Sequence, residues 1–578
     1  MKQQVAKKRN KQSVRAGRRL YAMLLLLLLS TIGLATRAVT LQVVDTEFLQ
    51  NQGEARYLRE IEIPATRGVI YDRNGVPLAV STPVESVWVH PAQLLEERDN
   101  IDALAELLGL DADEIERKLT RRLDKEFVWL ERRLPPADAE KIRELELPGV
   151  FLQREYRRFY PSGEVSTHVL GFTNIDDIGQ EGLELAYNDW LQGVPGKKRV
   201  IKDRRGRVVE DVDLIMPAQP GRSLTLSLDH RLQYLAYREL MRTMKEHKAN
   251  SGSVVLLDVA SSEILAMVNS PSYNPNQQGR RESDALRNRA VTDVVEPGSV
   301  MKPFTVAAAL ETGNYQPDSP VDTSPGTIEI SGHTISDTNN YGLLDVTGLV
   351  TKSSNVGVSK LALSMEAEHL WGSLSRFGFG KVTGSTFPGE SAGVLRDYQR
   401  WHKVEQATIS YGYGISATAL QLAQAFTALA NDGRMRAPSF IKSANNPATS
   451  VLDPAIAAQV RQMMLTVTGP DGTGKQARIK NYQVAGKTGT SRKASAAGYE
   501  ERYVGSFIGF APASDPQLVA VVVVNDPQGD SYYGGTVAGP LFSRVMSGAL
   551  RLLDIPPDDF QTMLVANNNA GPELVDGP

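Results

Sequence analysis

A serine followed three residues later by a lysine is the first pair in this chain whose spacing could support catalysis. Acyl transfer by serine needs a hydroxyl nucleophile with a base beside it, and one helical turn brings residues at this spacing together. The spacing occurs at Ser299–Lys302 and at Ser439–Lys442. Since proline is tolerated only in a helix's first turn, Pro303 predicts a helix beginning near Ser299, where the dipole favours negative charge. We predict that Ser299 is the nucleophile, although an ordinary N-cap would have the same pattern.

The second serine–lysine pair lacks this setting. Ser439 lies between Pro438 and Pro447, in a segment that reads as a short strand or loop. Alternate residues of a strand point to opposite faces, so the spacing need not bring Ser439 and Lys442 together.

Two further motifs follow Ser299 along the chain. Ser353-Ser354-Asn355 starts 54 residues after Ser299, and Lys487-Thr488-Gly489-Thr490 starts 134 residues after Ser353. Each is weak alone, because Asn355 could be a turn residue and Lys487–Thr490 could be an exposed strand end. At the end of a strand beginning near residue 484, however, a glycine would let a ligand backbone approach, and hydroxyl and ammonium groups suit a carboxylate. Their order matches the serine–lysine signature of β-lactamases and penicillin-binding proteins.

With these motifs and other landmarks, the chain resembles the class B penicillin-binding proteins, and most closely their cell-division transpeptidases, from the apolar N-terminal segment to about residue 555. The landmarks are residues 67–75, 158–164, 171–173, 181–184, 202–204, 353–360 and 411–414. The resemblance implies an α+β fold with a single N-terminal transmembrane helix, an elongated pedestal domain and a β-lactamase-like transpeptidase domain, whose antiparallel sheet is flanked by helices.

The resemblance also implies roles for the motif residues. Ser299 would attack the penultimate D-alanine carbonyl of a stem peptide, with Lys302 as general base and Ser353 as proton relay. Asn355 would hold Lys302 and the substrate amide, and Lys487 would orient the network. The terminal carboxylate would bind at Thr488, Gly489 and Thr490, and the backbone N–H groups of Ser299 and Thr490 would form the oxyanion hole.

The implied partners are D-Ala-D-Ala stem peptides with an amine acceptor, β-lactam antibiotics, the inner membrane, a membrane glycosyltransferase of the FtsW type and other divisome proteins. No cofactor, metal or nucleic acid is implied. Val300-Met301 departs from the Thr-Val common in the family. A paralogue with altered β-lactam affinity, a non-enzymatic β-lactam sensor and a divisome scaffold therefore remain open alternatives.

The elements that must position these residues can be anticipated from hydrophobic patterning. Apolar strands are predicted at residues 253–259, 264–268, 484–490, 506–511 and 518–524, with a final helix opened by Pro540. Strands at both ends with helices between them indicate one α+β domain whose termini share a sheet. Before Pro220, residues 61–63 predict a strand, 72–75 a hairpin turn and 101–121 helical spacing.

An apolar segment near the N-terminus addresses the membrane. Residues 20–36 carry no charge, and the preceding 19 residues carry eight basic side chains and no acid. A helix of this length rises about 25 Å, enough for a short span. The positive-inside rule then predicts a cytoplasmic tail (1–19), a transmembrane helix (20–36), and a periplasmic pedestal (37–225), transpeptidase domain (226–558) and disordered tail (559–578). We expect the helix to continue over 38–56; a cleaved signal peptide is the alternative.

Composition excludes several other functions. The chain has no cysteine, which removes disulfides, thiol catalysis and cysteine-based zinc sites. Its net charge of −3 gives no reason to expect a nucleic-acid partner. Asn481 stands where a phosphate-binding loop ending at Lys487 would need glycine, and His-Glu-x-x-His and Gly-x-Ser-x-Gly motifs are absent from the sequence.

Overall fold

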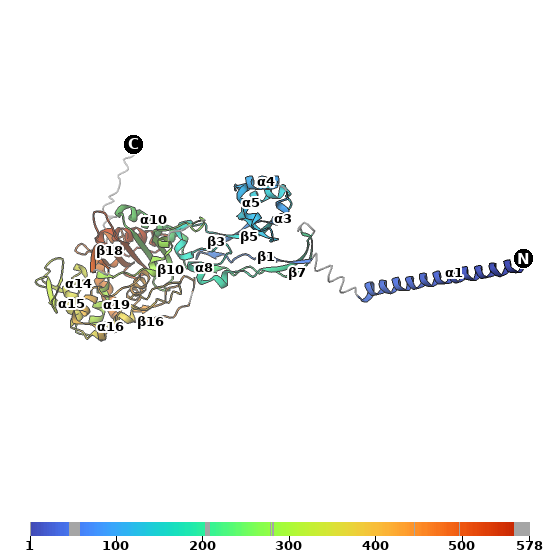
Figure 1. Cartoon of the computed structure of the whole chain (residues 1–578). Helices are drawn as coiled ribbons and strands as arrows, with labels where there is room; N and C mark the ends of the chain where they lie inside the picture. Colours follow the sequence, from blue (N-terminus) through green and yellow to red (C-terminus); the bar gives the residue numbers. More distant parts are fainter. Residues whose placement is uncertain are drawn as a thin grey trace, which may run out of the picture. The chain divides into compact units, whose positions relative to one another are not determined.

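The computed structural model describes residues 2–44, 58–96, 98–202, 208–277, 279, 283–443, 445–495 and 498–559. The chain forms two compact units (Figure 1). The first is built from Met1–Ala65, Pro83–Glu155 and Val194–Gln219, and the second from Thr66–Thr82, Tyr156–Gly193 and Pro220–Pro578. The predicted disordered tail and most of the predicted helical extension over 38–56 lie outside the described residues.

The first unit contains an antiparallel sheet in the order β1-β6-β7 and a small helical subdomain. The sheet comprises β1 (Leu58–Ile63), β6 (Gly196–Lys202) and β7 (Val208–Met216). The end of β3 (Pro77–Val89) pairs with β4 (Val128–Leu134), and β5 (Val150–Phe159) also pairs with β3. The helices are α3 (Pro91–Leu94), α4 (Arg98–Leu108), α5 (Ala112–Thr120) and α6 (Pro136–Glu144).

The predicted helical region over 101–121 is two helices. Gly109 has a φ of +65°, a left-handed conformation that favours glycine and ends α4. The Asp111 side chain then accepts a hydrogen bond from the Glu114 backbone N–H and begins α5.

The second unit starts with the predicted hairpin, in which β2 (Ile70–Tyr71) pairs with the start of β3. A parallel strand, β8 (Leu224–Thr225), adds to β2, and α7 (Thr167–Leu170), α8 (Gly182–Ala186) and α9 (Asn188–Leu191) follow in the chain. The landmark segments meet at Glu184, whose buried carboxylate lies 2.6 Å from the Nε atoms of both Arg67 and Arg158. Because each charge is paired, this buried cluster holds the segments together without leaving an uncompensated ion.

The main sheet of the second unit has the order β10-β9-β19-β18-β17 and is antiparallel throughout. Its strands are β9 (Ser251–Asp258), β10 (Ile264–Ser270), β17 (Ala485–Ser495), β18 (Gly498–Ala511) and β19 (Leu518–Asn525). The late strand β19 pairs with the early strand β9, with Leu518 opposite Asp258 and Asn525 opposite Ser251. The prediction that both ends of this domain share one sheet is confirmed.

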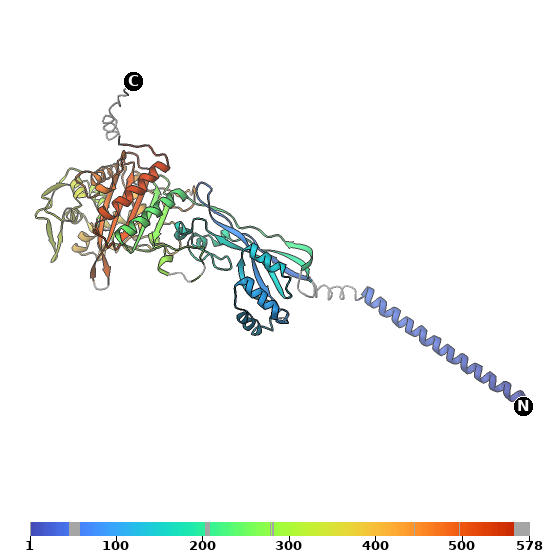
Figure 2. The same ribbon diagram turned by 90° about the horizontal axis from the view of Figure 1, so that it is seen from above.

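Helices cover both faces of this sheet, which explains the uninterrupted apolar strands. Along β9, Val254 and Leu256 belong to one core, and Val255 and Leu257 to the other. The first core is closed by α10 (His230–His247) and α21 (Gly539–Leu552), which lie side by side (Figure 2). A strand buried on both faces needs no polar alternation.

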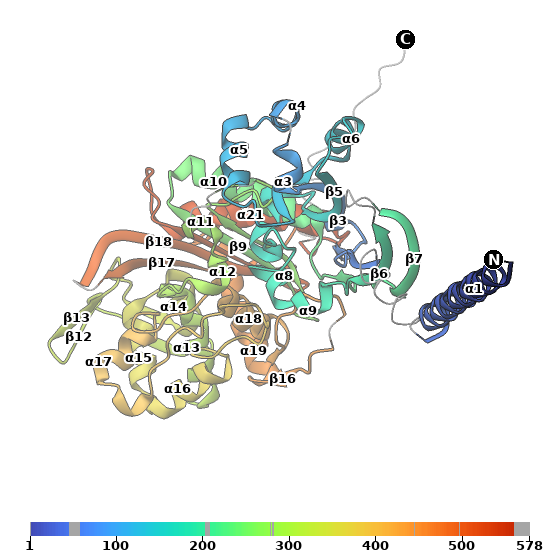
Figure 3. The same cartoon turned by 45° about the vertical axis from the view of Figure 1, so that its right-hand side comes forward.

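The opposite face carries the helical layer that holds the motif residues (Figure 3). Its central helix, α18 (Ala419–Ala430), is buried along its whole length. Phe304 of α13 has its ring within 4.8–5.3 Å of three other phenylalanine rings, which anchors α13 just after Lys302. The remaining helices of the layer are α14 (Val346–Lys352), α15 (Asn355–Leu363), α16 (Ala367–Arg376), α17 (Lys403–Ile409) and α19 (Pro454–Thr468).

The N-terminal helix α1 spans Lys2–Val39 and is followed by a π-helical turn, Thr40–Val44. Within the described residues, one helical stretch, Gly17–Val44, is long and apolar enough to cross a membrane. It contains the predicted span 20–36.

Candidate active site

Ser299 lies in a 3-10 turn, η3 (Gly298–Met301), that leads directly into α13 (Lys302–Glu311). Pro303 occupies the first turn of α13, as the sequence predicted, and the Lys302 backbone N–H donates to the Ser299 carbonyl. Ser299 is half-buried. A Cβ on Gly298, whose φ is +61°, would lie 3.2 Å from the Thr490 carbonyl oxygen. Glycine therefore lets the turn carrying Ser299 approach strand β17.

Lys302 is fully buried, and three acceptors surround its ammonium group. Its Nζ donates to the Ser353 hydroxyl (3.0 Å), to the Asn355 side-chain oxygen (2.8 Å) and to the Ser353 carbonyl. Burial lowers the pKa of Lys302 well below its usual value, the nearby charge of Lys487 lowers it further, and Asp337 opposes the shift. The site thus favours the neutral amine that a general base requires.

Ser353 and Asn355 reach Lys302 because the chain turns sharply between α14 and α15. Ser353 adopts a left-handed φ of +61° just after α14, and its hydroxyl and carbonyl both contact the lysine. Ser354 caps α15 by accepting from the Gly357 backbone N–H, so Asn355 is the first helical residue. The middle residue of the motif is therefore a helix cap, and the outer two face the lysine.

Asp337, which the sequence reasoning missed, holds this turn in place. It follows β13 (His333–Ser336), and its carboxylate accepts from the Ser354 hydroxyl (2.5 Å) and from the backbone N–H groups of Asn355 (2.5 Å) and Val356 (3.0 Å). A carboxylate at a helix N-terminus also complements the dipole. No local spacing could reveal this contact, because it joins two separate elements of the fold.

Lys487, Thr488, Gly489 and Thr490 lie within β17, which continues to Ser495. The expectation that they end the strand is wrong, and the alternative of an exposed end fails, because Lys487 is fully buried. Pairing with β18 carries β17 on through polar residues that the apolar pattern could not mark. A Cβ on Gly489 would lie 3.0 Å from the Pro297 carbonyl oxygen and closer still to the Ser506 hydroxyl, so glycine is needed beside η3.

Lys487 joins the third motif to the other two. Its Nζ donates to the Ser353 hydroxyl at 2.9 Å, and burial lowers its pKa to about 7. The Ser353 hydroxyl thus accepts from both lysines. A hydroxyl has two lone pairs, so its own proton stays available to a third group.

The threonine hydroxyls of β17 are also fixed. The Thr490 hydroxyl oxygen accepts from the Gly534 backbone N–H at 3.0 Å, which leaves its hydrogen free to donate to a ligand. The Thr488 and Thr473 hydroxyls bond to each other at 2.7 Å.

The structure therefore brings Lys302, Ser353, Asn355 and Lys487 into one hydrogen-bonded cluster. Within the described residues, no hydrogen bond joins the Ser299 hydroxyl to it; such bonds are often long before a substrate binds.

The second serine–lysine pair does not form a site. Ser439 lies outside any helix, in an isolated bridge with Glu263, as the prolines predicted. Its hydroxyl bonds to the Ile441 backbone, and Lys442 donates to the Arg73 carbonyl at 2.9 Å. Each of these side chains is engaged locally.

A glutamate three residues before Ser299 ties the nucleophile segment to its surroundings. The Glu296 carboxylate accepts from the Gly414 backbone N–H (2.8 Å) and from the Tyr499 hydroxyl of β18 (3.1 Å). The Tyr413 ring packs edge-on against Tyr499 at 5.5 Å. Burial, and secondarily Glu296, raises the pKa of Tyr499, which keeps the phenol protonated as a donor.

Chemically, the cluster places an amine biased toward its neutral form one residue after the turn that carries Ser299, next to a serine hydroxyl and an amide. Such an arrangement can take a proton from a nucleophile and pass it to a leaving group.

Comparison with known proteins agrees with this geometry. The family model of the penicillin-binding protein transpeptidase domain matches residues 252–547, and that of the penicillin-binding protein dimerisation domain matches residues 62–226. The chain is 44% identical to the peptidoglycan D,D-transpeptidase FtsI of Escherichia coli over 543 residues, covering 93% of this chain and 92% of that protein.

Two further similarities cover most of the chain. It is 41% identical over 551 residues to the probable peptidoglycan D,D-transpeptidase PbpC of Pseudomonas aeruginosa, covering 95% of this chain and 98% of that protein. The crystal structure of a peptidoglycan synthetase from Bifidobacterium adolescentis is similar with a TM-score of 0.68 and 26% identity, covering 87% of this chain and 98% of that one. The chain therefore belongs to the penicillin-binding proteins, as a class B member of the FtsI type.

Proposed function

We propose that this chain is a peptidoglycan D,D-transpeptidase that cross-links stem peptides of the septal wall through an acyl-enzyme on Ser299, and that β-lactams acylate the same serine. The observation that carries the proposal is the contact of Lys302 with both Ser353 and Asn355, completed by Lys487 on the Ser353 hydroxyl. Three motifs far apart in the sequence thereby converge on one buried amine next to the turn that carries Ser299.

In the acylation step, the Ser299 oxygen attacks the penultimate D-alanine carbonyl as its proton passes to the neutral amine of Lys302. The C–N bond to the terminal D-alanine then breaks, and the leaving amine takes a proton relayed through Ser353, which Lys302 replenishes. The Ser299 ester remains, and one D-alanine is released. The low pKa of Lys302 supports this role, since a lysine charged at neutral pH could not accept the proton.

In the second step, an amino group of another stem peptide attacks the ester carbonyl. Its proton returns through the same groups to the Ser299 oxygen, the ester C–O bond breaks, and a new peptide bond joins the two strands. Asn355, held by Lys302 and by the Ser336 carbonyl, presents its amide beside this path.

Substrate orientation is assigned to β17. The free hydrogen of the Thr490 hydroxyl, with Thr488 and the Lys487 charge nearby, suits the terminal carboxylate of the donor. The backbone N–H groups of Ser299 and Thr490 would form the oxyanion hole, and the close approach of Gly298 to Thr490 supports this pairing.

The same proposal extends to location and partners. The apolar stretch Gly17–Val44 would anchor the chain in the inner membrane with its basic N-terminus inside, and would place the pedestal (37–225) and transpeptidase domain (226–558) in the periplasm. A membrane glycosyltransferase of the FtsW type and other divisome proteins are the proposed partners. Protease added to spheroplasts should leave only a small anchored fragment, whereas a soluble form beginning near residue 36 would favour signal-peptide cleavage.

The decisive test of the chemistry uses the full chain in detergent with a synthetic donor peptide ending in D-Ala-D-Ala and an amine acceptor. We expect release of one D-alanine per peptide bond formed, and loss of both products in Ser299→Ala. Release that persists in Ser299→Ala would contradict the proposal.

A further inference from the structure

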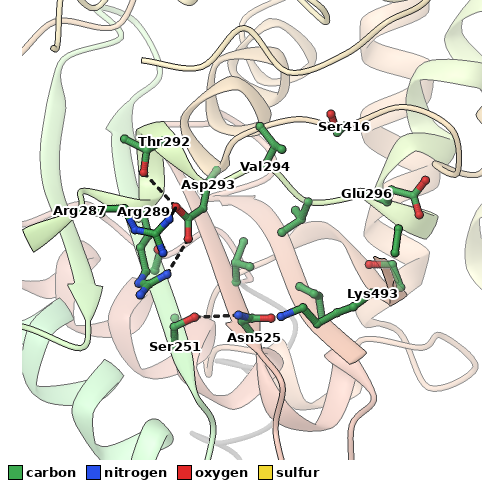
Figure 4. Close-up of a pocket in the computed structure, with 18 of the residues that line it drawn as sticks. Ser251, Arg287, Arg289, Thr292, Asp293, Val294, Glu296, Ser416, Lys493 and Asn525 are labelled. Atoms are coloured by element: carbon green, nitrogen blue, oxygen red, sulfur yellow. Dashed lines mark hydrogen bonds and ion pairs between the residues drawn. The ribbon is translucent and has the colours of Figure 1, made fainter. Parts of the chain in front are cut away.

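A polar pocket of about 540 Å³ lies beside the catalytic cluster but is lined by none of its residues (Figure 4). Its floor is the ends of β9, β19, β18 and β17, and its wall includes the segment 292–296 that precedes η3. Glu296 of the wall is three residues before Ser299, and Ser491 of the floor directly follows Thr490. A ligand in this pocket would therefore touch both segments that build the active site.

Two basic side chains at one side of the pocket are already neutralised. Figure 4 shows Arg287 and Arg289 grouped with Asp293, and Arg289 lies 2.6 Å from Asp284 and 2.7 Å from Asp293. Arg287 pairs with the same two carboxylates. These four charges balance and leave the ligand chemistry to the remaining groups.

The remaining charged groups include one exposed cation and two half-buried groups of opposite sign. Arg492 is exposed to solvent, whereas Lys493 is half-buried and, among the described residues, has no carboxylate partner. Figure 4 shows its side chain extending toward Asn525, while Glu296 lies at the other side of the pocket. One Glu296 oxygen accepts the two hydrogen bonds described above, whereas the other is buried with no partner.

Further unmet polar atoms line the same space. The Asn525 side-chain nitrogen donates to the Ser251 hydroxyl at 2.8 Å, but its buried oxygen has no partner in the described structure, and neither has the Arg289 Nε. Buried polar atoms are rarely left unpaired, because each costs free energy unless a water or a ligand satisfies it. Between the charged groups the pocket surface is apolar, formed by Val295, Val504 and Val523.

We propose that this pocket binds a short zwitterionic peptide with small aliphatic side chains, of which dialanine is the simplest probe. Its carboxylate pairs with Lys493, its ammonium group with the free oxygen of Glu296, and its methyl groups lie on the valines. A ligand of either single charge would leave one of the two half-buried charges unpaired, which is the reason for the zwitterion.

The test measures dialanine binding to the full chain by calorimetry, before and after the active site is blocked with benzylpenicillin. Dialanine amide lacks the carboxylate, and N-acetyl-dialanine lacks the ammonium group. We expect dialanine to bind the blocked protein and each derivative to bind about 10- to 100-fold more weakly, the equivalent of one charge-assisted hydrogen bond. If benzylpenicillin does not acylate the chain, which intact mass reports separately, the same titrations on unblocked protein still decide the question.

Two substitutions assign the ends of the ligand. In Lys493→Met, dialanine and its amide should bind alike; in Glu296→Gln, which keeps an acceptor for Gly414 and Tyr499, dialanine and N-acetyl-dialanine should bind alike. Lys245→Met, at an exposed lysine of α10, is the matched control and should change neither preference. Thermal unfolding confirms that each variant is folded. Absence of dialanine binding at about 10 mM, or preferences that survive both substitutions, would overturn the proposal.

Discussion

Replacing Lys302 by arginine tests the general-base assignment most directly. Arginine keeps a positive charge but cannot give up its proton in a protein. In this site the guanidinium would be permanently charged, fully buried and close to Lys487, in a position whose environment favours a neutral amine. Proton abstraction from Ser299 would lose its acceptor.

The expected loss can be stated from the role. General-base catalysis contributes about 10²–10⁴-fold to a rate, which corresponds to about 2.7–5.4 kcal/mol of activation free energy. The larger side chain also overpacks a closed site, which costs about 1–3 kcal/mol of folding stability. The kinetic loss should therefore appear in protein that unfolds at a lower temperature but is still folded during the assay.

The assay is the second-order rate constant for acylation by a fluorescent penicillin, followed across pH. In the native chain the rate should rise as Lys302 loses its proton, well below the pH at which an ordinary lysine titrates. Lys302→Arg should lack this rise. The matched control is Lys442→Arg in the second serine–lysine pair, whose Nζ contacts only a backbone carbonyl and which should stay within about 0.5 kcal/mol, or roughly twofold, of the native rate. A Lys302→Arg variant that acylates within threefold of the native chain, with the same pH profile, would refute the reasoning.

Three further predictions follow from the same geometry. Peptide mapping after penicillin treatment should find one adduct per chain, on the peptide containing Ser299; Ser439→Ala should keep it, and an adduct on Ser439 would reverse the assignment. Asp337→Asn removes the charged acceptor that holds the Ser354–Val356 turn, so stability should fall by about 0.5–2 kcal/mol, and the pH at which acylation rises should move down, because a charge that raises the Lys302 pKa is lost. An unchanged pH midpoint would count against the electrostatic part. Lys487 has a folded pKa of about 7, below its unfolded value near 10.5, so between these limits the unfolded chain binds the extra proton and stability should rise with pH by up to about 1.4 kcal/mol per unit. Urea titrations between pH 7 and 9.5 should show a shallower slope in Lys487→Met and an unaltered slope in the exposed control Lys480→Met.

The sequence was sufficient for the features that depend on local rules. Pro303 restricts where a helix can begin, and this placed Ser299 at the start of α13 and kept Ser439 out of any helix. The continuous apolar runs predicted the strands of the main sheet, since a strand buried on both faces has no polar alternation. The order of the three motifs, together with the landmark segments, was enough to identify the family.

What only the tertiary structure decided are the contacts between elements that are distant in the sequence. The length of β17 depends on pairing with β18, which carries it through polar residues beyond Thr490. The helix cap by Asp337 joins β13 to α15, and no periodicity encodes which carboxylate meets a helix end. The low pKa of Lys302 likewise arises from burial and from Lys487, 185 residues away in the sequence. Desolvation and through-space charge depend on three-dimensional surroundings, so a sequence can name the reactive groups but cannot set their protonation states.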